Sequence, residues 1–232
     1  MDIRATTPEP ADFGLPPVLP GDWRALPDEL EQALRQRLAA SNLIDEGRAI
    51  EMVRVLPLGF FEGWMLCDFL LGEVGPSADS ELAALVMLYG PDGFTPLDDY
   101  RRIERHVELH GVRLEGVDLC LSFVRFAAAF GALGEAPHFI AQGDGDAIAP
   151  PDVALAATSP SVLDGVRAPE AARISATMIC EDELHRLELR LASDGMITVL
   201  ARETLGPAAT VEAVRREGSM RYGPRERAED AQ

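Results

Sequence analysis

The sequence has 232 residues, of which 47% are hydrophobic and 26% are charged, so the chain is long and apolar enough to bury a core. Its formal net charge is −18, from 21 basic and 39 acidic residues. Nucleic acids and anionic membranes bind proteins through cationic side chains, so this charge argues against both as partners. It fits a basic protein partner, a cation, or solubility alone.

All the basic residues are arginine, because the sequence contains no lysine. This excludes Schiff-base enzymes, phosphate-loop nucleotidases of the Gly-Lys-Ser/Thr type and the lysine of protein kinases. The three cysteines, Cys67, Cys120 and Cys180, are far apart and each lies in an apolar run. We therefore expect buried thiols and neither a disulfide framework nor a cysteine metal knuckle.

Neither a signal peptide nor a membrane span is predicted. No apolar segment follows the first residues, and the longest apolar runs, 60–71 and 119–133, are interrupted by charges and fall short of a span. The expected location is the cytoplasm.

The first half of the chain predicts an arm followed by strands and helices. Six prolines within 1–27 indicate an extended, proline-rich arm. Pro27 and the acids after it start a helix with leucines every fourth residue. Apolar runs then predict strands, and helices are expected at 100–110 and 117–130, the first capped by an aspartate and ended by Gly111.

The second half predicts a linker and a meander. Residues 143–171 are rich in Gly, Ala, Pro, Asp and Ser, which is typical of a long loop. Three strands follow at 173–180, 184–192 and 196–203, the middle one alternating leucine with charge, and Asp194-Gly195 predicts the hairpin turn. Residues 206–232 are expected to form a flexible tail.

These patterns predict an α+β fold: antiparallel sheets with a few packed helices, an extended arm and a C-terminal three-stranded meander. We expect the arm at 1–27, a single domain over 28–205 that contains the 143–171 loop, and the tail.

The strongest local hint of chemistry is a histidine pair on the 100–110 helix. His106 and His110 are four residues apart, as in zinc-binding helices, but Glu108 occupies the middle position, where it faces away from them. A third ligand has to come from elsewhere, with His185 or Glu104 as candidates. The alternative is an ordinary helix that happens to carry two histidines, so zinc is a hypothesis and no other cofactor is predicted.

Several other motifs are missing. The sequence contains neither the G-x-S-x-G serine elbow nor a G-x-G-x-x-G dinucleotide fingerprint. Gly143-Asp144-Gly145-Asp146 lacks the glutamate of a calcium loop. No catalytic residue is predicted, and an enzyme is disfavoured.

Aromatic residues offer a candidate binding surface. Trp23, Phe60, Phe61, Trp64 and Phe94 are more than a small sheet needs for its core, and Phe60, Phe61, Trp64 and Phe94 are the candidate partner-binding residues. If they are exposed, they form an apolar patch that marks a partner site, and if not, they are core residues.

Three segments resemble a family of uncharacterised bacterial proteins. They are LYGPDGFTPLD (88–98), LCLSFVRFAAAF (119–130) with the strand HFIAQ after it, and ISATMICEDELHRLELRLASDGMITVLARETL (174–205). The resemblance implies a strand–turn–strand ending in Leu-Asp, a helix rich in Phe and Arg, and a C-terminal meander. It also implies one domain over 50–205, and it implies no activity.

Two functions follow as hypotheses. The first is a non-catalytic protein-binding, accessory or adaptor protein whose partner is another protein, and the acidic charge allows that partner to be basic. The second is a small metal-dependent enzyme or metal-binding protein that uses His106 and His110. A homo-oligomer stays open.

Overall fold

The computed structural model describes residues 7–8, 13–44, 47–73, 81–133, 138–139, 161–164, 172–180, 183–208 and 215–224. The expected arm, loop and tail therefore lie partly outside the described residues, at 1–6, 9–12, most of 143–171, 209–214 and 225–232. Within the described residues, no helix is long and apolar enough to cross a membrane.

The chain forms two compact units. The first unit comprises Met1–Leu58, Gly63–Asp98 and Val214–Gln232, and the second comprises Gly59–Glu62 and Asp99–Ala213. The domain that we expected over 28–205 thus takes its residues from both units.

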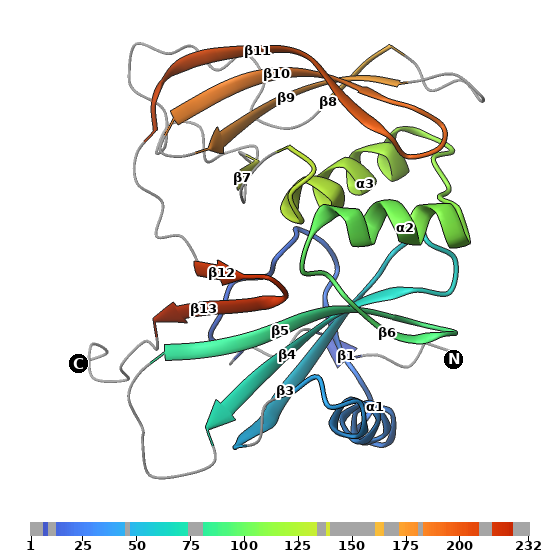
Figure 1. Cartoon of the computed structure of the whole chain (residues 1–232), viewed down its shortest axis with the longest axis vertical. Helices are drawn as coiled ribbons and strands as arrows, with labels where there is room; N and C mark the ends of the chain where they lie inside the picture. Colours follow the sequence, from blue (N-terminus) through green and yellow to red (C-terminus); the bar gives the residue numbers. More distant parts are fainter. Residues whose placement is uncertain are drawn as a thin grey trace. The chain divides into compact units, whose positions relative to one another are not determined.

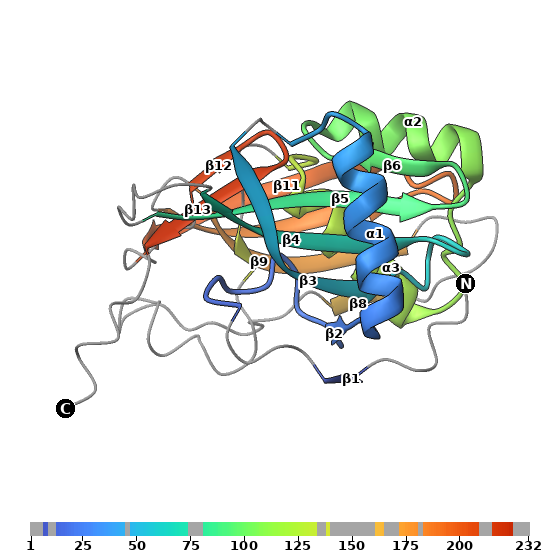
Figure 2. The ribbon, with the colours of Figure 1, turned by 90° about the horizontal axis from the view of Figure 1, so that it is seen from below.

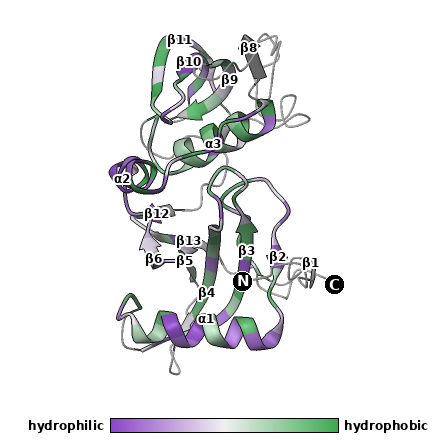
Figure 3. Ribbon diagram, turned by 90° about the vertical axis from the view of Figure 1, so that its right-hand side faces the viewer, coloured by the Kyte–Doolittle hydropathy of each residue, from purple (hydrophilic) through white to green (hydrophobic). Residues whose placement is uncertain are grey.

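The first unit is built on an antiparallel sheet whose strands run in the order β1-β2-β3-β4-β5-β13-β12, with β6 paired to β5. The strands are β1 (Thr7–Pro8), β2 (Arg24–Ala25), β3 (Arg48–Pro57), β4 (Met65–Glu73), β5 (Glu81–Gly90), β6 (Gly93–Pro96), β12 (Arg215–Glu217) and β13 (Met220–Pro224). β4 is largely hydrophobic in Figure 3, as expected for a strand that is covered on both faces.

Helix α1 (Asp28–Ala40) covers one face of this sheet and crosses β3, β4 and β5 (Figure 2). Acidic side chains fill its first turn, where the helix dipole favours negative charge. Leu34 and Leu38 are buried and pack with alternate residues of the strands, among them Val53, Phe69 and Leu85. The four-residue spacing of the leucines therefore determines which side of α1 faces the sheet.

The opposite face of the sheet is covered in part by residues 13–23, which we call the arm segment. Phe13 and Leu15 are buried and form a second apolar cluster with Leu70 and Ala84. Trp23 is also buried, and its indole Nε1 donates a hydrogen bond of 2.7 Å to the carbonyl of Leu19.

The second unit contains helices α2 (Tyr100–His110) and α3 (Val117–Ala129) and a five-stranded antiparallel sheet. The sheet runs in the order β11-β10-β9-β7, with β8 also paired to β9 (Figure 1). Its strands are β7 (His138–Phe139), β8 (Ser161–Asp164), β9 (Ala172–Cys180), β10 (Glu183–Leu191) and β11 (Ile197–Pro207). Each unit thus pairs an antiparallel sheet with helices, and the predicted α+β class and C-terminal meander are confirmed.

One segment differs from the prediction. Residues 215–224 form the hairpin β12–β13 where a flexible tail was expected. β13 pairs with β5, with Met220 opposite Leu85 and Tyr222 opposite Ala83. Met220 and Tyr222 pack against the core on α1's side. Because only these alternate positions are apolar, the segment contains no apolar run that would have predicted a strand.

Candidate functional site

The second unit contains a groove between α2 and the turn that joins β10 to β11, with a volume of about 620 Å³. Its lining comes from one side of the helix and from the turn: Tyr100, Ile103, Glu104, Val107, Glu108, Gly111, Val112, Ser193, Asp194, Gly195 and Met196.

Local signals position the helical wall of the groove. The side chain of Asp99 accepts a hydrogen bond of 3.1 Å from the backbone N–H of Arg102, so it caps the start of α2. Gly111 ends the helix with a φ of +73°, and its N–H donates to the carbonyl of Val107. The lining residues between these ends recur three and four positions apart, so they share one face of α2.

The turn forms the opposite wall. Gly195 has a φ of +83°, which the hairpin requires, and the carboxylate of Asp194 accepts a hydrogen bond of 3.1 Å from the N–H of Met196. A Cβ at Gly195 would lie 3.2–3.3 Å from side-chain atoms of Phe123, Val112 and Val107, so a larger residue there would have to push these side chains outward by a few tenths of an ångström.

The groove has an acidic rim around an apolar centre. Its charged lining residues are all acids, Glu104, Glu108 and Asp194, and all three are exposed. Among the described residues, neither glutamate forms an ion pair. Burial raises the pKa of Tyr100, and the negative charges of Glu104 and Asp194 raise it further, so both walls contribute negative potential at this hydroxyl.

The basic residues of α2 lie outside the groove. Arg101, Arg102 and Arg105 fall between the lining positions of the helix, and none of them lines the hollow. The helix therefore separates its charges, presenting acids to the groove and arginines elsewhere. This separation makes the groove suited to a cationic, partly apolar ligand.

A second hollow of about 420 Å³ adjoins the first, since Val112 and Ser193 line both. Its other lining residues include Arg113, Glu115 and Cys120. The Cys120 thiol is buried and donates to the carbonyl of Leu114 at 3.4 Å, and burial raises its pKa. Burial therefore disfavours the thiolate, which is the reactive form of the side chain.

The histidines do not come together as one cluster. The ring of His106 is buried and lies 4.7 Å from that of Phe61 and 4.5 Å from that of His110. His185 instead contacts Arg202 at 2.9 Å and Thr204 at 3.2 Å through its two ring nitrogens. In the part of the chain that is described, no group of three His, Cys, Asp or Glu residues could hold a metal ion.

Glu104, the other candidate third ligand, lines the groove on a different side of α2 from His106. Neither proposed third ligand, His185 or Glu104, lies with His106 and His110, so zinc at this pair stays a prediction.

The aromatic residues that the sequence offered as a candidate patch are not on the surface. Phe60, Phe61 and Trp64 keep only 2%, 2% and 5% of their surface accessible, and Phe94 is half-buried. The two phenylalanines pack edge-on against rings of α3, with Phe60 and Phe123 centred 5.5 Å apart. Of the two alternatives that the sequence left open, the core alternative holds for these three residues.

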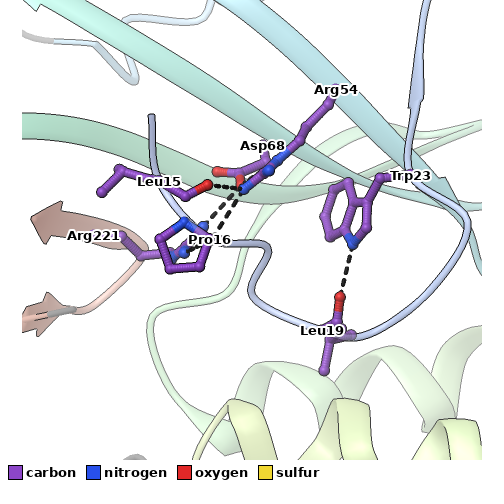
Figure 4. A network of polar contacts seen from close by, with 7 residues as sticks. All are labelled: Leu15, Pro16, Leu19, Trp23, Arg54, Asp68 and Arg221. Carbon is purple, nitrogen blue, oxygen red and sulfur yellow. Dashed lines mark hydrogen bonds and ion pairs between the residues drawn. The ribbon is translucent and has the colours of Figure 1, made fainter. Parts of the chain in front are cut away.

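The first unit buries a network of charges on the arm side of its sheet (Figure 4). Asp68 accepts hydrogen bonds from Arg54 and Arg221, and these three side chains are 0%, 1% and 4% exposed. Figure 4 shows the two guanidinium groups beside the carbonyls of Leu15 and Pro16. The network thus links three strands of the sheet, β3, β4 and β13, with the arm segment.

Sequence reasoning missed both the groove and the buried network. The spacing of Glu104 and Glu108 on one helix face was visible, but the acid that completes the rim, Asp194, lies far along the chain. Comparisons with protein-family models, with curated proteins and with solved structures gave no match, so the site rests on its own geometry.

Proposed function

We propose that this chain is a non-catalytic, cytoplasmic protein-binding protein, and that the groove between α2 and the β10–β11 turn receives a basic, amphipathic segment of a partner protein. The observation that carries the proposal is the charge of the groove. All its charged lining residues are acids, although α2 itself carries three arginines.

The apolar centre of the groove supports a protein segment over a simple cation. Ile103, Val107 and Val112 lie between the acids, and Met196 is 53% exposed beside them. Apolar side chains of a partner would be desolvated there, while its arginines or lysines would meet the rim. A volume of about 620 Å³ lies within the range of roughly 300–1,000 Å³ that is typical of ligand pockets.

The charge of the whole chain supports the same partner. A net charge of −18 steers basic molecules toward the protein and repels acidic ones. This long-range attraction is not specific, so a test has to separate it from the local effect of the rim.

The test is a binding titration followed by fluorescence anisotropy. The probe is a labelled synthetic 14-residue peptide with leucines and arginines at helical spacing, and a second peptide carries glutamate in place of arginine. We expect the arginine peptide to bind and the glutamate peptide not to bind. Added salt should weaken the binding, because exposed charges are screened.

Matched variants of the protein locate the binding. The rim variant Glu104→Gln/Glu108→Gln/Asp194→Asn removes three charges and keeps the size of each side chain. Exposed ion pairs are worth about 0.2–1 kcal/mol each, so three of them predict roughly a tenfold loss of affinity. The control variant Glu62→Gln/Asp118→Asn/Glu188→Gln neutralises three exposed acids elsewhere in the same unit, so it changes the net charge equally.

The proposal holds if the rim variant loses about tenfold in affinity and the control variant loses less than threefold. Equal losses would mean that only the net charge attracts the peptide. Absence of binding to the unaltered protein would reject the groove as a site for basic segments.

A further inference from the structure

The buried charges of the first unit join segments from opposite ends of the described chain. Arg54 and Asp68 lie directly opposite each other on β3 and β4. Arg221 lies on β13 opposite Ala84 of β5, and Asp68 lies opposite Val86 of the same strand. Since positions two apart share a face of a sheet, all three side chains point to the face that the arm segment covers.

The network contains one more positive charge than negative charge. One oxygen of Asp68, Oδ2, accepts hydrogen bonds from Nε and Nη2 of Arg54 at 3.0 and 2.7 Å and from Nη1 of Arg221 at 2.8 Å. The other oxygen, Oδ1, accepts none from the described residues. A buried ion without compensation is costly, so the second guanidinium needs further acceptors.

The arm segment supplies those acceptors. Nη2 of Arg54 donates to the carbonyls of Leu15 and Pro16, both at 3.0 Å, and Nη2 of Arg221 donates to the same carbonyl of Pro16. Proline-rich chain adopts an extended conformation without internal hydrogen bonds, which leaves its carbonyls available. The carbonyl of Pro16 is thus shared by an arginine from β3 and an arginine from β13.

Aromatic rings of the arm segment complete the enclosure. The guanidinium carbon of Arg54 lies 3.8 Å from the centre of the Phe13 ring and 5.1 Å from that of Trp23. Such cation–π contacts are strongest where the cation is desolvated, as it is here. Release of the arm segment would remove both rings and both carbonyls from two buried guanidiniums.

We infer that the arm segment and β13 form a latch that opens and closes as one unit, because each completes the coordination of the buried charges that hold the other. The coupling spans 205 positions of the sequence, from Pro16 to Arg221. Opening would expose an apolar face that includes Leu70 and Ala84, together with two guanidiniums on an otherwise acidic protein.

Limited proteolysis of the full chain with chymotrypsin tests this coupling. Leu15 and Leu19 precede prolines and resist cleavage, so the arm segment has two sensitive bonds, Phe13–Gly14 and Trp23–Arg24. When opening is rapid relative to cleavage, the cleavage rate follows the open population. Mass spectrometry identifies the bond that is cut.

Two substitutions of Arg221, which is far from both bonds in the sequence, test the prediction. Arg221→Met removes the charge and the contact with Pro16. Arg221→Lys keeps a charge for Asp68, but a single ammonium cannot reproduce the fork that reaches both Asp68 and Pro16. We expect both variants to speed cleavage of the arm segment at least tenfold, a change of about 1.4 kcal/mol in opening. Arg186→Met, which breaks an exposed ion pair with Glu203 in the other unit, should leave the rate unchanged.

Coupling between two segments is reciprocal, so the reverse experiment must agree. Phe13→Ala should speed hydrogen exchange of the β13 amides, while exchange of the central strand β4 and of β10 stays unchanged. The latch is overturned if neither Arg221 variant accelerates cleavage of the arm segment, or if Phe13→Ala leaves exchange in β13 as it was. Arg221→Lys retains a charged partner for Asp68, so it decides the question even if Arg221→Met does not fold.

Discussion

Replacing Asp68 by asparagine removes the one anion of the buried network and leaves its shape almost unchanged. Arg54 and Arg221 would then share a site with no negative charge. Both side chains are buried, with exposed fractions of 1% and 4%. Removing one partner of a buried ion pair costs about 3–5 kcal/mol, because the remaining charge has no compensation. We expect Asp68→Asn to cost this much in the free energy of unfolding.

Urea denaturation followed by tryptophan fluorescence measures this cost. Trp23 and Trp64 are the two tryptophans of the sequence, both are buried, and both belong to the first unit. Their signal therefore reports the unfolding of the unit that contains Asp68. With a slope of about 2 kcal/mol per molar urea, the midpoint should fall by roughly 2 M.

Two further variants show whether charge is the cause. Asp22→Asn breaks an exposed ion pair with Arg24 in the same unit, where the Asp22 side chain is 76% accessible, and should cost less than about 1 kcal/mol. Arg54→Met/Asp68→Leu/Arg221→Met removes all three charges together and should be more stable than Asp68→Asn, since an apolar replacement of a buried ion cluster is often neutral. A loss below about 1 kcal/mol for Asp68→Asn would refute the reasoning from buried charge.

Three more predictions concern packing and titration. Gly90→Ala should cost about 1–3 kcal/mol in the same urea assay, because the added Cβ would lie 2.3–2.6 Å from ring atoms of Trp64. Gly195→Ala should cost roughly 1–2 kcal/mol in a circular-dichroism melt, because alanine is strained at a φ of +83°, and an unchanged melt would show that the turn adapts. Burial raises the pKa of the Cys67 thiol above its usual 9.0, and Asp68 raises it further. The unfolded chain then loses this proton first as pH rises, so the free energy of unfolding should fall above about pH 9. The fall should be smaller in Cys67→Ala, and equal slopes in the two proteins would contradict this origin.

The boundaries of the helices could be predicted from the sequence, because the signals that set them are local. The prediction for α2, residues 100–110, matches Tyr100–His110, since the cap at Asp99 and the glycine at Gly111 act within one turn of the helix. The meander could also be predicted from the sequence. The alternation of leucine with charge along β10 and the Asp-Gly turn both involve residues that are adjacent in the chain. The packing of Leu34 and Leu38 under the sheet followed from their spacing.

The aromatic residues show where a count of residue types is insufficient. Phe60 and Phe61 follow each other in the sequence, and nothing local indicates that both are buried. Their burial depends on α3, which places Phe123 and Phe126 around them. Burial of such residues is a property of the partners that the fold brings together.

The sequence by itself determined the α+β class, the helices and the hairpin of this protein, together with its negative charge, because each depends on composition or on residues within a few positions of one another. Only the tertiary structure decided that Asp194 faces Glu104 across a groove, and that Asp68 meets Arg221 from 153 positions away. In both cases strand register and chain reversal place the groups, and the free energy that selects the register comes from the whole sheet and its covering layers. Neither contact leaves a signal in the residues next to it.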